Sequence, residues 1–173
     1  PEVVRQHLAD YYALTTYLDT QIGRVIQALR DSGAWEHTLV VMAGDSGLAV
    51  GNHGLMGKQN IYDEDGVHVP FLLSGGVIQD RARDIDALCY IHDIFPTICD
   101  LAGVPIPESV TGKSLLPVIN HQQEQIRDHT YHAYRQFQRA YRKDGYKLIE
   151  YVRAPDKDKT RGTFIAGSRV TQL

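Results

Sequence analysis

Apolar side chains recur every three or four positions near the start of the chain, with charged and polar residues between them. The apolar positions are Leu8, Tyr12, Leu14, Leu18, Ile22, Val25, Ile26 and Leu29. The stretch contains no proline, and Gly33 follows it where a helix is expected to end. This spacing predicts one long amphipathic helix over residues 4–32, with its apolar stripe packed against a core.

Two shorter runs are apolar without alternation, residues 38–43 (TLVVMA) and residues 69–73 (VPFLL), and glycines follow closely behind both. A run of this kind is typical of a strand buried on both faces, as in the centre of a parallel sheet. A long helix that leads into such a strand indicates an α/β fold. We therefore predict that the two runs are neighbouring strands of one sheet, with the helix of residues 4–32 packed on one face.

The pattern changes in the second half of the chain. Residues 90–102 predict a helix with Pro96 in its first turns and Gly103 as its stop. Residues 129–151 form short alternating runs around an Asp-Gly turn at positions 144 and 145, which indicates a separate small antiparallel sheet. The polar tail after Pro155 is expected to be poorly ordered. We predict an α/β part over residues 1–120 and a small α+β subdomain, with hairpin and tail, over residues 121–173.

Composition narrows the classes of protein to consider. The 173 residues are 43% apolar and 23% charged, with a net charge of −3, which excludes a disordered chain. No basic excess points to nucleic acid or to an anionic membrane surface, and no apolar run reaches the length of a transmembrane helix. Cys89 and Cys99 are too few for a disulfide framework or a zinc site. The chain begins without Met or a signal peptide, so we expect it to be part of something longer.

The residues with chemical potential follow the first predicted strand. Asp45 lies between two glycines at the carboxyl end of that strand, which is where open α/β sheets bind ligands. His53, Lys58 and His68 follow in or just after an irregular segment rich in glycine. From the residues alone, Asp45 is either a plain turn residue or part of an anion or metal site.

Three segments resemble the C-terminal half of the sulfatase family, which belongs to the alkaline-phosphatase superfamily. They are residues 40–47 (VVMAGDSG), 51–58 (GNHGLMGK) and 67–70 (VHVP). Further matches, in the family's order, are residues 17–24 (YLDTQIGR), 93–98 (DIFPTI), 101–103 (LAG) and 112–116 (GKSLL). The resemblance implies that residues 1–120 are part of an alkaline-phosphatase-like sheet with flanking helices.

The resemblance also implies roles for individual residues. Asp45 falls where a sulfatase carboxylate binds a divalent cation, usually Ca²⁺, and Ser46 falls on the next ligand, where the family has Asn or His. A serine hydroxyl is a neutral oxygen donor that suits calcium only as a weak ligand. Lys58 falls on the lysine that contacts the sulfate group, and His53 in the same motif either shapes the loop or contacts substrate. The metal residues would be Asp45 and Ser46, and the catalytic and substrate-binding residues Lys58 and His53. His68 has either a structural or a site role.

The implied activity is hydrolysis of a sulfate monoester, with a small molecule or a saccharide as the alcohol. A sulfatase nucleophile is a formylglycine made from the first residue of a Cys/Ser-x-Pro/Ala-x-Arg motif, and this sequence contains no such motif. We therefore expect the chain to be the C-terminal portion of a sulfatase, inactive alone, and call the whole enzyme the parent. The alternatives are a phosphate or phosphonate ester hydrolase of the same superfamily and a non-catalytic relative. The compartment stays open, because a signal peptide preceding this chain would make the parent periplasmic, secreted or lysosomal.

Overall fold

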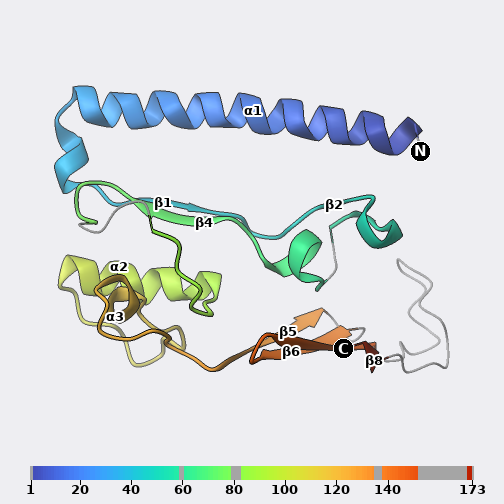
Figure 1. Cartoon of the computed structure of the whole chain (residues 1–173). Helices are drawn as coiled ribbons and strands as arrows, with labels where there is room; N and C mark the ends of the chain where they lie inside the picture. Colours follow the sequence, from blue (N-terminus) through green and yellow to red (C-terminus); the bar gives the residue numbers. More distant parts are fainter. Residues whose placement is uncertain (1, 59–60, 79–82, 135–137, 152–170, 173) are drawn as a thin grey trace. The chain divides into compact units, whose positions relative to one another are not determined.

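The structure is a computed structural model that describes residues 2–58, 61–78, 83–134, 138–151 and 171–172 (Figure 1). The chain forms two compact units, Pro1–Arg81 and Ala82–Leu173. The boundary between these units, after Arg81, divides this chain by its internal contacts. The expected division into residues 1–120 and 121–173 refers instead to the domains of the parent, and it stays a prediction. No helix in the described part of the chain is long and apolar enough to cross a membrane.

The first unit begins with α1, Glu2–Asp31, a single continuous helix in Figure 1. The predicted helix is confirmed, and Gly33 ends it with a left-handed φ of 73° and an N–H bond to the Arg30 carbonyl at 3.1 Å. The expected burial of its apolar stripe is wrong for the described structure. No residue of α1 is buried, and Leu14, for example, is 68% exposed. The stripe is covered only in part, because Leu8, Ile22, Ile26 and Leu29 are half-buried while Leu14, Leu18 and Val25 are exposed.

The two continuous apolar runs pair as predicted. Strand β1, Val40–Ala43, and strand β4, Phe71–Ser74, form a two-stranded sheet in which Val40 lies opposite Ser74. The pairing is antiparallel, so the expectation of a central parallel strand buried on both faces is wrong here. Because each strand of a two-stranded sheet is an edge, side chains on both faces remain at least partly exposed.

Short elements lie between these strands. After Ala34–His37, a 3-10 turn that precedes β1, the chain runs through β1 into β2, Ala49–Val50, which pairs with β3, Met56–Gly57, around the 3-10 turn Asn52–Gly54. A single π-helical turn, Asp63–Val67, then precedes β4. Ala49 and Ile61 are the buried apolar side chains of this region, 1% and 3% exposed.

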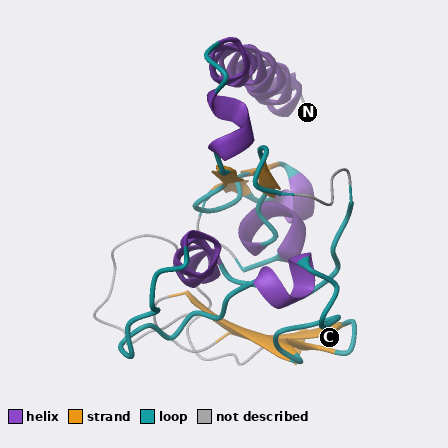
Figure 2. Cartoon of the chain, turned by 90° about the vertical axis from the view of Figure 1, so that its left-hand side faces the viewer, coloured by secondary structure: helices purple, strands orange, loops and turns teal. Residues whose placement is uncertain are grey.

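The second unit contains α2, Ile94–Ala102, and α3, Leu116–Ile119. The 3-10 turn Ile91–Asp93 leads into α2, which ends at the left-handed Gly103 as predicted. The small sheet is confirmed, with the antiparallel order β5 (His129–Tyr134), β6 (Gln138–Lys143), β7 (Tyr146–Tyr151) and β8 (Thr171–Gln172), drawn in orange in Figure 2.

The Asp-Gly turn of this sheet lies where the sequence predicts it. Asp144 and Gly145 both have positive φ, 50° and 80°, as the tight turn of a two-residue hairpin requires. Near the end of the tail, β8 pairs with β7, with Gln172 opposite Ile149. Residues 152–170 of the tail lie outside the described residues. The mixture of helices and sheet, with a small antiparallel sheet near the C-terminus, agrees with the predicted fold class.

Candidate functional site

The turn of residues 44–47 follows β1 directly and carries the two predicted metal residues. The side chains of Asp45 and Ser46 are exposed, and the Ser46 hydroxyl donates to Asp45 Oδ1 over 3.3 Å. The turn ends at Gly47, whose N–H donates to the Gly66 carbonyl at 2.8 Å. A Cβ at Gly47 would lie 2.5 Å from the Asp65 carbonyl oxygen, so only glycine allows this close approach. The turn is therefore fixed against the π-helical turn Asp63–Val67.

Lys58 follows β3 and returns to the same turn. Its Nζ lies 3.3 Å from Asp45 Oδ1, so the structure brings together Asp45, Ser46 and Lys58 as the sequence predicts. The Asp45 and Lys58 side chains are 85% and 54% exposed. The hydrogen bond and the charge of Lys58 lower the pKa of Asp45, so the carboxylate is ionised at neutral pH. The pair places one positive and one negative group, both open to solvent, at the carboxyl end of β1.

His53 has a different environment. Its backbone is left-handed, with φ 52°, and its ring stacks on Tyr62 with 4.8 Å between centroids. It occupies the 3-10 turn between β2 and β3, on the segment that leads to Lys58. Its role in contacting substrate stays a prediction, and so does the role of His68, which is exposed just before Val69.

The donors in the turn are of the kind that calcium prefers. Asp45 offers a carboxylate and Ser46 a hydroxyl, and Ca²⁺ binds six to eight oxygen ligands in proteins. Among the residues that the structure describes, no three His, Cys, Asp or Glu side chains are grouped to hold a metal. The turn thus fits part of a calcium shell, and further ligands would have to come from elsewhere.

Two residues of this region were missed by sequence reasoning. Asn52 Nδ2 donates to Asp65 Oδ1 at 2.9 Å, and Asp65 is only 4% exposed. From the sequence, residues 63–65 are an acidic cluster in an irregular segment, a pattern that favours a solvated surface. The π-helical turn Asp63–Val67 buries Asp65 instead.

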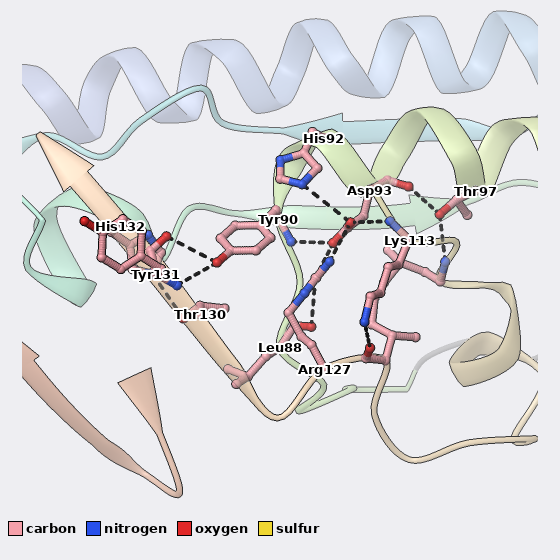
Figure 3. Close-up of polar contacts among 12 residues, drawn as sticks. Leu88, Tyr90, His92, Asp93, Thr97, Lys113, Arg127, Thr130, Tyr131 and His132 are labelled. Atoms are coloured by element: carbon pink, nitrogen blue, oxygen red, sulfur yellow. Dashed lines mark hydrogen bonds and ion pairs between the residues drawn. The ribbon is translucent and has the colours of Figure 1, made fainter. Parts of the chain in front are cut away.

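A second polar cluster, in the second unit, is centred on the fully buried Asp93 (Figure 3). Its carboxylate accepts hydrogen bonds from both terminal nitrogens of Arg127 and from the backbone N–H groups of Tyr90 at 2.6 Å and Lys113 at 2.8 Å. Burial alone would raise the pKa of Asp93, but these bonds outweigh it and the pKa is lowered. The Arg127 guanidinium also lies 4.5 Å from the centre of the Tyr90 ring.

The surroundings of Asp93 identify its role. The Tyr90 hydroxyl accepts from the Tyr131 N–H at 2.6 Å, and Thr97 links the Asp93 carbonyl to the Leu115 N–H. The cluster therefore joins the start of α2 to strand β5 and to the segment before α3. Every group in it has a partner inside the protein, which is typical of a structural network.

The cysteines offer no activated thiol. Cys99 is buried, and burial together with the charge of Asp93 raises the pKa of Cys89. A thiol with a raised pKa is a poor nucleophile, because the thiolate is the reactive form. This agrees with the lack of a sulfatase nucleophile motif around either residue.

The known proteins with similar sequences include two sulfatases. Arylsulfatase K of Bos taurus is 36% identical over 109 residues, which cover 63% of this chain and 20% of that protein. Delta 4,5-hexuronate-2-O-sulfatase of Bacteroides thetaiotaomicron is 30% identical over 132 residues, which cover 75% of this chain and 27% of that protein. The chain therefore spans only 20% to 27% of the length of these two relatives.

Solved structures agree with the predicted fold. Phosphonate monoester hydrolase of Agrobacterium radiobacter matches with a TM-score of 0.72 and 26% identity, over 82% of this chain and 32% of that one. A protein solved in complex with its substrate D-glucosamine-2-N,6-O-disulfate matches with a TM-score of 0.70 and 26% identity, over 77% of this chain and 29% of that one. The predicted alkaline-phosphatase-like fold is confirmed. The family profile named Sulfatase matches residues 1–104, and the chain belongs to the sulfatase family.

Proposed function

We propose that this chain is the C-terminal portion of an enzyme that hydrolyses sulfate monoesters. The observation that carries the proposal is the pair of Lys58 and Asp45, 3.3 Å apart and exposed at the carboxyl end of β1. The resemblance to sulfatases implies that Lys58 contacts the sulfate group and that Asp45 is a metal ligand. The curated relatives named above are sulfatases, which supports the same activity for the parent.

Lys58 would act on the sulfate group. A lysine ammonium is a compact positive charge with three donors, and it stabilises negative charge that grows on sulfate oxygens during transfer. Asp45 holds this ammonium next to the turn, so the cation is in place before substrate binds. Because Lys58 is exposed, an incoming anion reaches it without crossing the core.

Asp45 and Ser46 would hold part of a calcium site, and His53 would line the approach to Lys58. Bound calcium would supply positive charge beside the sulfate oxygens, and the formylglycine of the N-terminal part would supply the nucleophile. Asp45 is suited to a cation because its carboxylate is ionised at neutral pH. The alcohol of the substrate is expected to be a small molecule or a saccharide, in line with the sulfated glucosamine bound by one structural relative.

Two alternatives predict different results. The likeness to phosphonate monoester hydrolase favours phosphonate or phosphate ester hydrolysis as the second candidate, and a non-catalytic relative is the third. The gene upstream of residue 1 is the first test, because a Cys/Ser-x-Pro-x-Arg motif there supports the sulfatase. A plain Ser or Thr nucleophile supports a phosphatase, and no nucleophile supports the third candidate.

The direct test is an assay of the full-length parent with a chromogenic aryl sulfate and with the matching phenylphosphonate ester. We expect the sulfate to have the higher kcat/KM. Lys58→Ala should lower kcat by about 100-fold and raise KM less, because the charge matters most in the transition state. Lys143→Ala is the matched control, since Lys143 is also an exposed lysine paired with a carboxylate, Asp128, at 3.1 Å. Preference for the phosphonate, or equal effects of the two alanine variants, would contradict the proposal.

Calcium titration tests the metal residues in the same enzyme. Asp45→Asn should weaken calcium binding, and high calcium should partly restore activity. Ser46→Asn should tighten binding, because an amide oxygen reaches further and is a better donor than a hydroxyl. Unchanged calcium affinity in Asp45→Asn would return Asp45 to the role of a plain turn residue. The isolated chain is expected to hydrolyse no aryl sulfate above background, because a lysine and a carboxylate do not replace a covalent nucleophile.

A further inference from the structure

The segment after Lys58 has contacts with both halves of the candidate site. Its π-helical turn, Asp63–Val67, is closed by a bond from the Val67 N–H to the Tyr62 carbonyl at 3.0 Å. Its Gly66 carbonyl accepts a hydrogen bond from the Gly47 N–H, at the end of the Asp45 turn. Its Asp65 side chain accepts a hydrogen bond from Asn52, in the turn that precedes Lys58. One short segment therefore contacts both the turn that carries Asp45 and the turn that precedes β3 and Lys58.

The turn that carries Asn52 needs such support. Gly51, His53 and Gly54 all have left-handed backbones, with φ of 109°, 52° and 71°. A left-handed backbone at a residue other than glycine is unfavourable, and it persists where surrounding contacts impose it. Two contacts to the segment after Lys58 impose it here, the Asn52–Asp65 hydrogen bond and the stacking of His53 on Tyr62.

The Asn52–Asp65 bond is the one of these two constraints that has a buried partner. Asp65 is only 4% exposed, so it accepts the amide N–H at 2.9 Å where water competes little. Loss of this bond would release the start of the turn that leads through β3 to Lys58.

We propose that Asn52 and Asp65 are positioning residues that set the place of Lys58 relative to the Asp45 turn. This inference rests on the proposed function, because it takes Lys58 as the residue that contacts the transferred sulfate. Neither Asn52 nor Asp65 touches the sulfate. Asn52 acts on Lys58 through the backbone that joins the Asn52 turn to Lys58. Asp65 acts on the Asp45 turn through the neighbouring Gly66, whose carbonyl accepts a hydrogen bond from the Gly47 N–H.

The experiment measures kcat and KM of the full-length parent with an aryl sulfate for Asn52→Ala, Lys58→Ala and the double variant. Substitution of residues that orient a site from outside it typically costs 10- to 100-fold in activity, and we expect a loss of about 10-fold in kcat for Asn52→Ala. In the Lys58→Ala background the same substitution should cause almost no further loss, because it acts through a side chain that is already gone. Asn120→Ala, an exposed asparagine of the second unit, is the matched control.

A second arm reverses the polarity of the hydrogen bond. Asn52→Asp sets two carboxylates against each other and should lower kcat further than Asn52→Ala does. Adding Asp65→Asn to this variant restores an amide–carboxylate bond and should recover most of the lost kcat. Recovery of this kind is expected of a pair that positions the site, and thermal melts of each variant show that the compared proteins are folded.

Three outcomes would overturn the inference. They are an unchanged kcat in Asn52→Ala, an equal loss in the presence and absence of Lys58, and no recovery in a folded Asn52→Asp/Asp65→Asn enzyme. Failure of the proposed function would look different. In that case Lys58→Ala itself would leave kcat unchanged, whereas here Lys58→Ala keeps its large loss and only the Asn52 and Asp65 variants depart from expectation.

Discussion

The carboxylate of Asp93 is 0% exposed and the carboxylate of Asp45 is 85% exposed, although each pairs with a basic side chain. Asp93 accepts hydrogen bonds from the two terminal nitrogens of Arg127 and from two backbone N–H groups (Figure 3). Asp45 has one contact with Lys58 and one with Ser46, at 3.3 Å each. The two pairs therefore share their charges but differ in burial and in the number of their partners.

This difference separates a structural pair from one that can exchange partners. Removing one member of a buried pair leaves an uncompensated charge away from water, which is costly. An exposed pair gains little from its own contact, because water and salt screen it. Lys58 can therefore leave Asp45 for an incoming anion at little cost, whereas Arg127 cannot leave Asp93 without disrupting the second unit.

The largest effect is expected for Asp93→Ala. It removes the acceptor of Arg127 and of the Tyr90 and Lys113 N–H groups, so we expect a loss of about 3–5 kcal/mol in the free energy of unfolding. Hydrogen exchange of backbone amides in β5, β6 and β7 measures it, because these strands adjoin the cluster through Tyr131. Asp128→Ala is the control, an exposed aspartate that also has a basic partner. Similar effects of the two substitutions would remove the contrast between buried and exposed pairs.

Acid should weaken the buried pair. Its folded pKa is lowered, so Asp93 contributes stability that is fully present above the pKa of the unfolded chain, about 3.9, and is lost as pH falls through the folded value. The difference in unfolding free energy between wild type and Asp93→Asn should therefore be constant near neutral pH and shrink below about pH 4. Urea titrations at several pH values measure this difference, and a difference that grows in acid would contradict the sign.

A smaller effect is expected for Tyr90→Phe. The substitution keeps the ring over Arg127 and removes only the hydroxyl, which accepts from the Tyr131 N–H and donates to the Tyr131 carbonyl at 3.2 Å. Loss of these two exposed bonds should cost about 1–2 kcal/mol. Exchange of the Tyr131 amide should accelerate, while the amide of Lys113, bound to Asp93, should stay protected. Equal acceleration at both amides would mean that the hydroxyl holds the whole cluster.

The smallest effect is expected for the exposed pair. Lys58→Ala and Asp45→Asn should leave the thermal unfolding of the first unit unchanged, because both side chains lie in water. Trp35 is the only tryptophan of the chain and belongs to this unit, so its fluorescence reports the transition. A clear fall in melting temperature would show that the pair is structural, like that of Asp93.

Local sequence signals predicted the elements well. The helix of residues 4–32, the stop at Gly103 and the Asp-Gly hairpin depend on neighbouring residues, and the structure has all three. What failed was packing. Continuous apolar runs and an apolar stripe indicate that a segment needs cover, but they do not state that the cover comes from the same chain. The described chain leaves α1 exposed and pairs β1 with β4 as two antiparallel edges.

The candidate site shows the same division. Asp45, Ser46 and Lys58 were predicted from short motifs, and the structure brings them together. Asn52 and Asp65 were missed because the hydrogen bond between them joins residues 13 positions apart in the sequence. The composition of residues 63–67 does not predict the π-helical turn that buries Asp65, because acidic residues favour a solvated loop. Short motifs therefore predicted the exposed groups of the candidate site, and only the fold revealed the Asn52–Asp65 contact beneath them.

The close approach of Gly47 to the Asp65 carbonyl restricts how this region can evolve. Any other residue at position 47 would place a Cβ 2.5 Å from backbone atoms of Asp65, so we expect substitutions there to distort the turn. Ser46, one position earlier, is exposed and meets no such limit. Natural variation or a directed library can therefore exchange the side chain at position 46, which the proposed function takes as a calcium ligand, while the backbone of the turn stays unchanged.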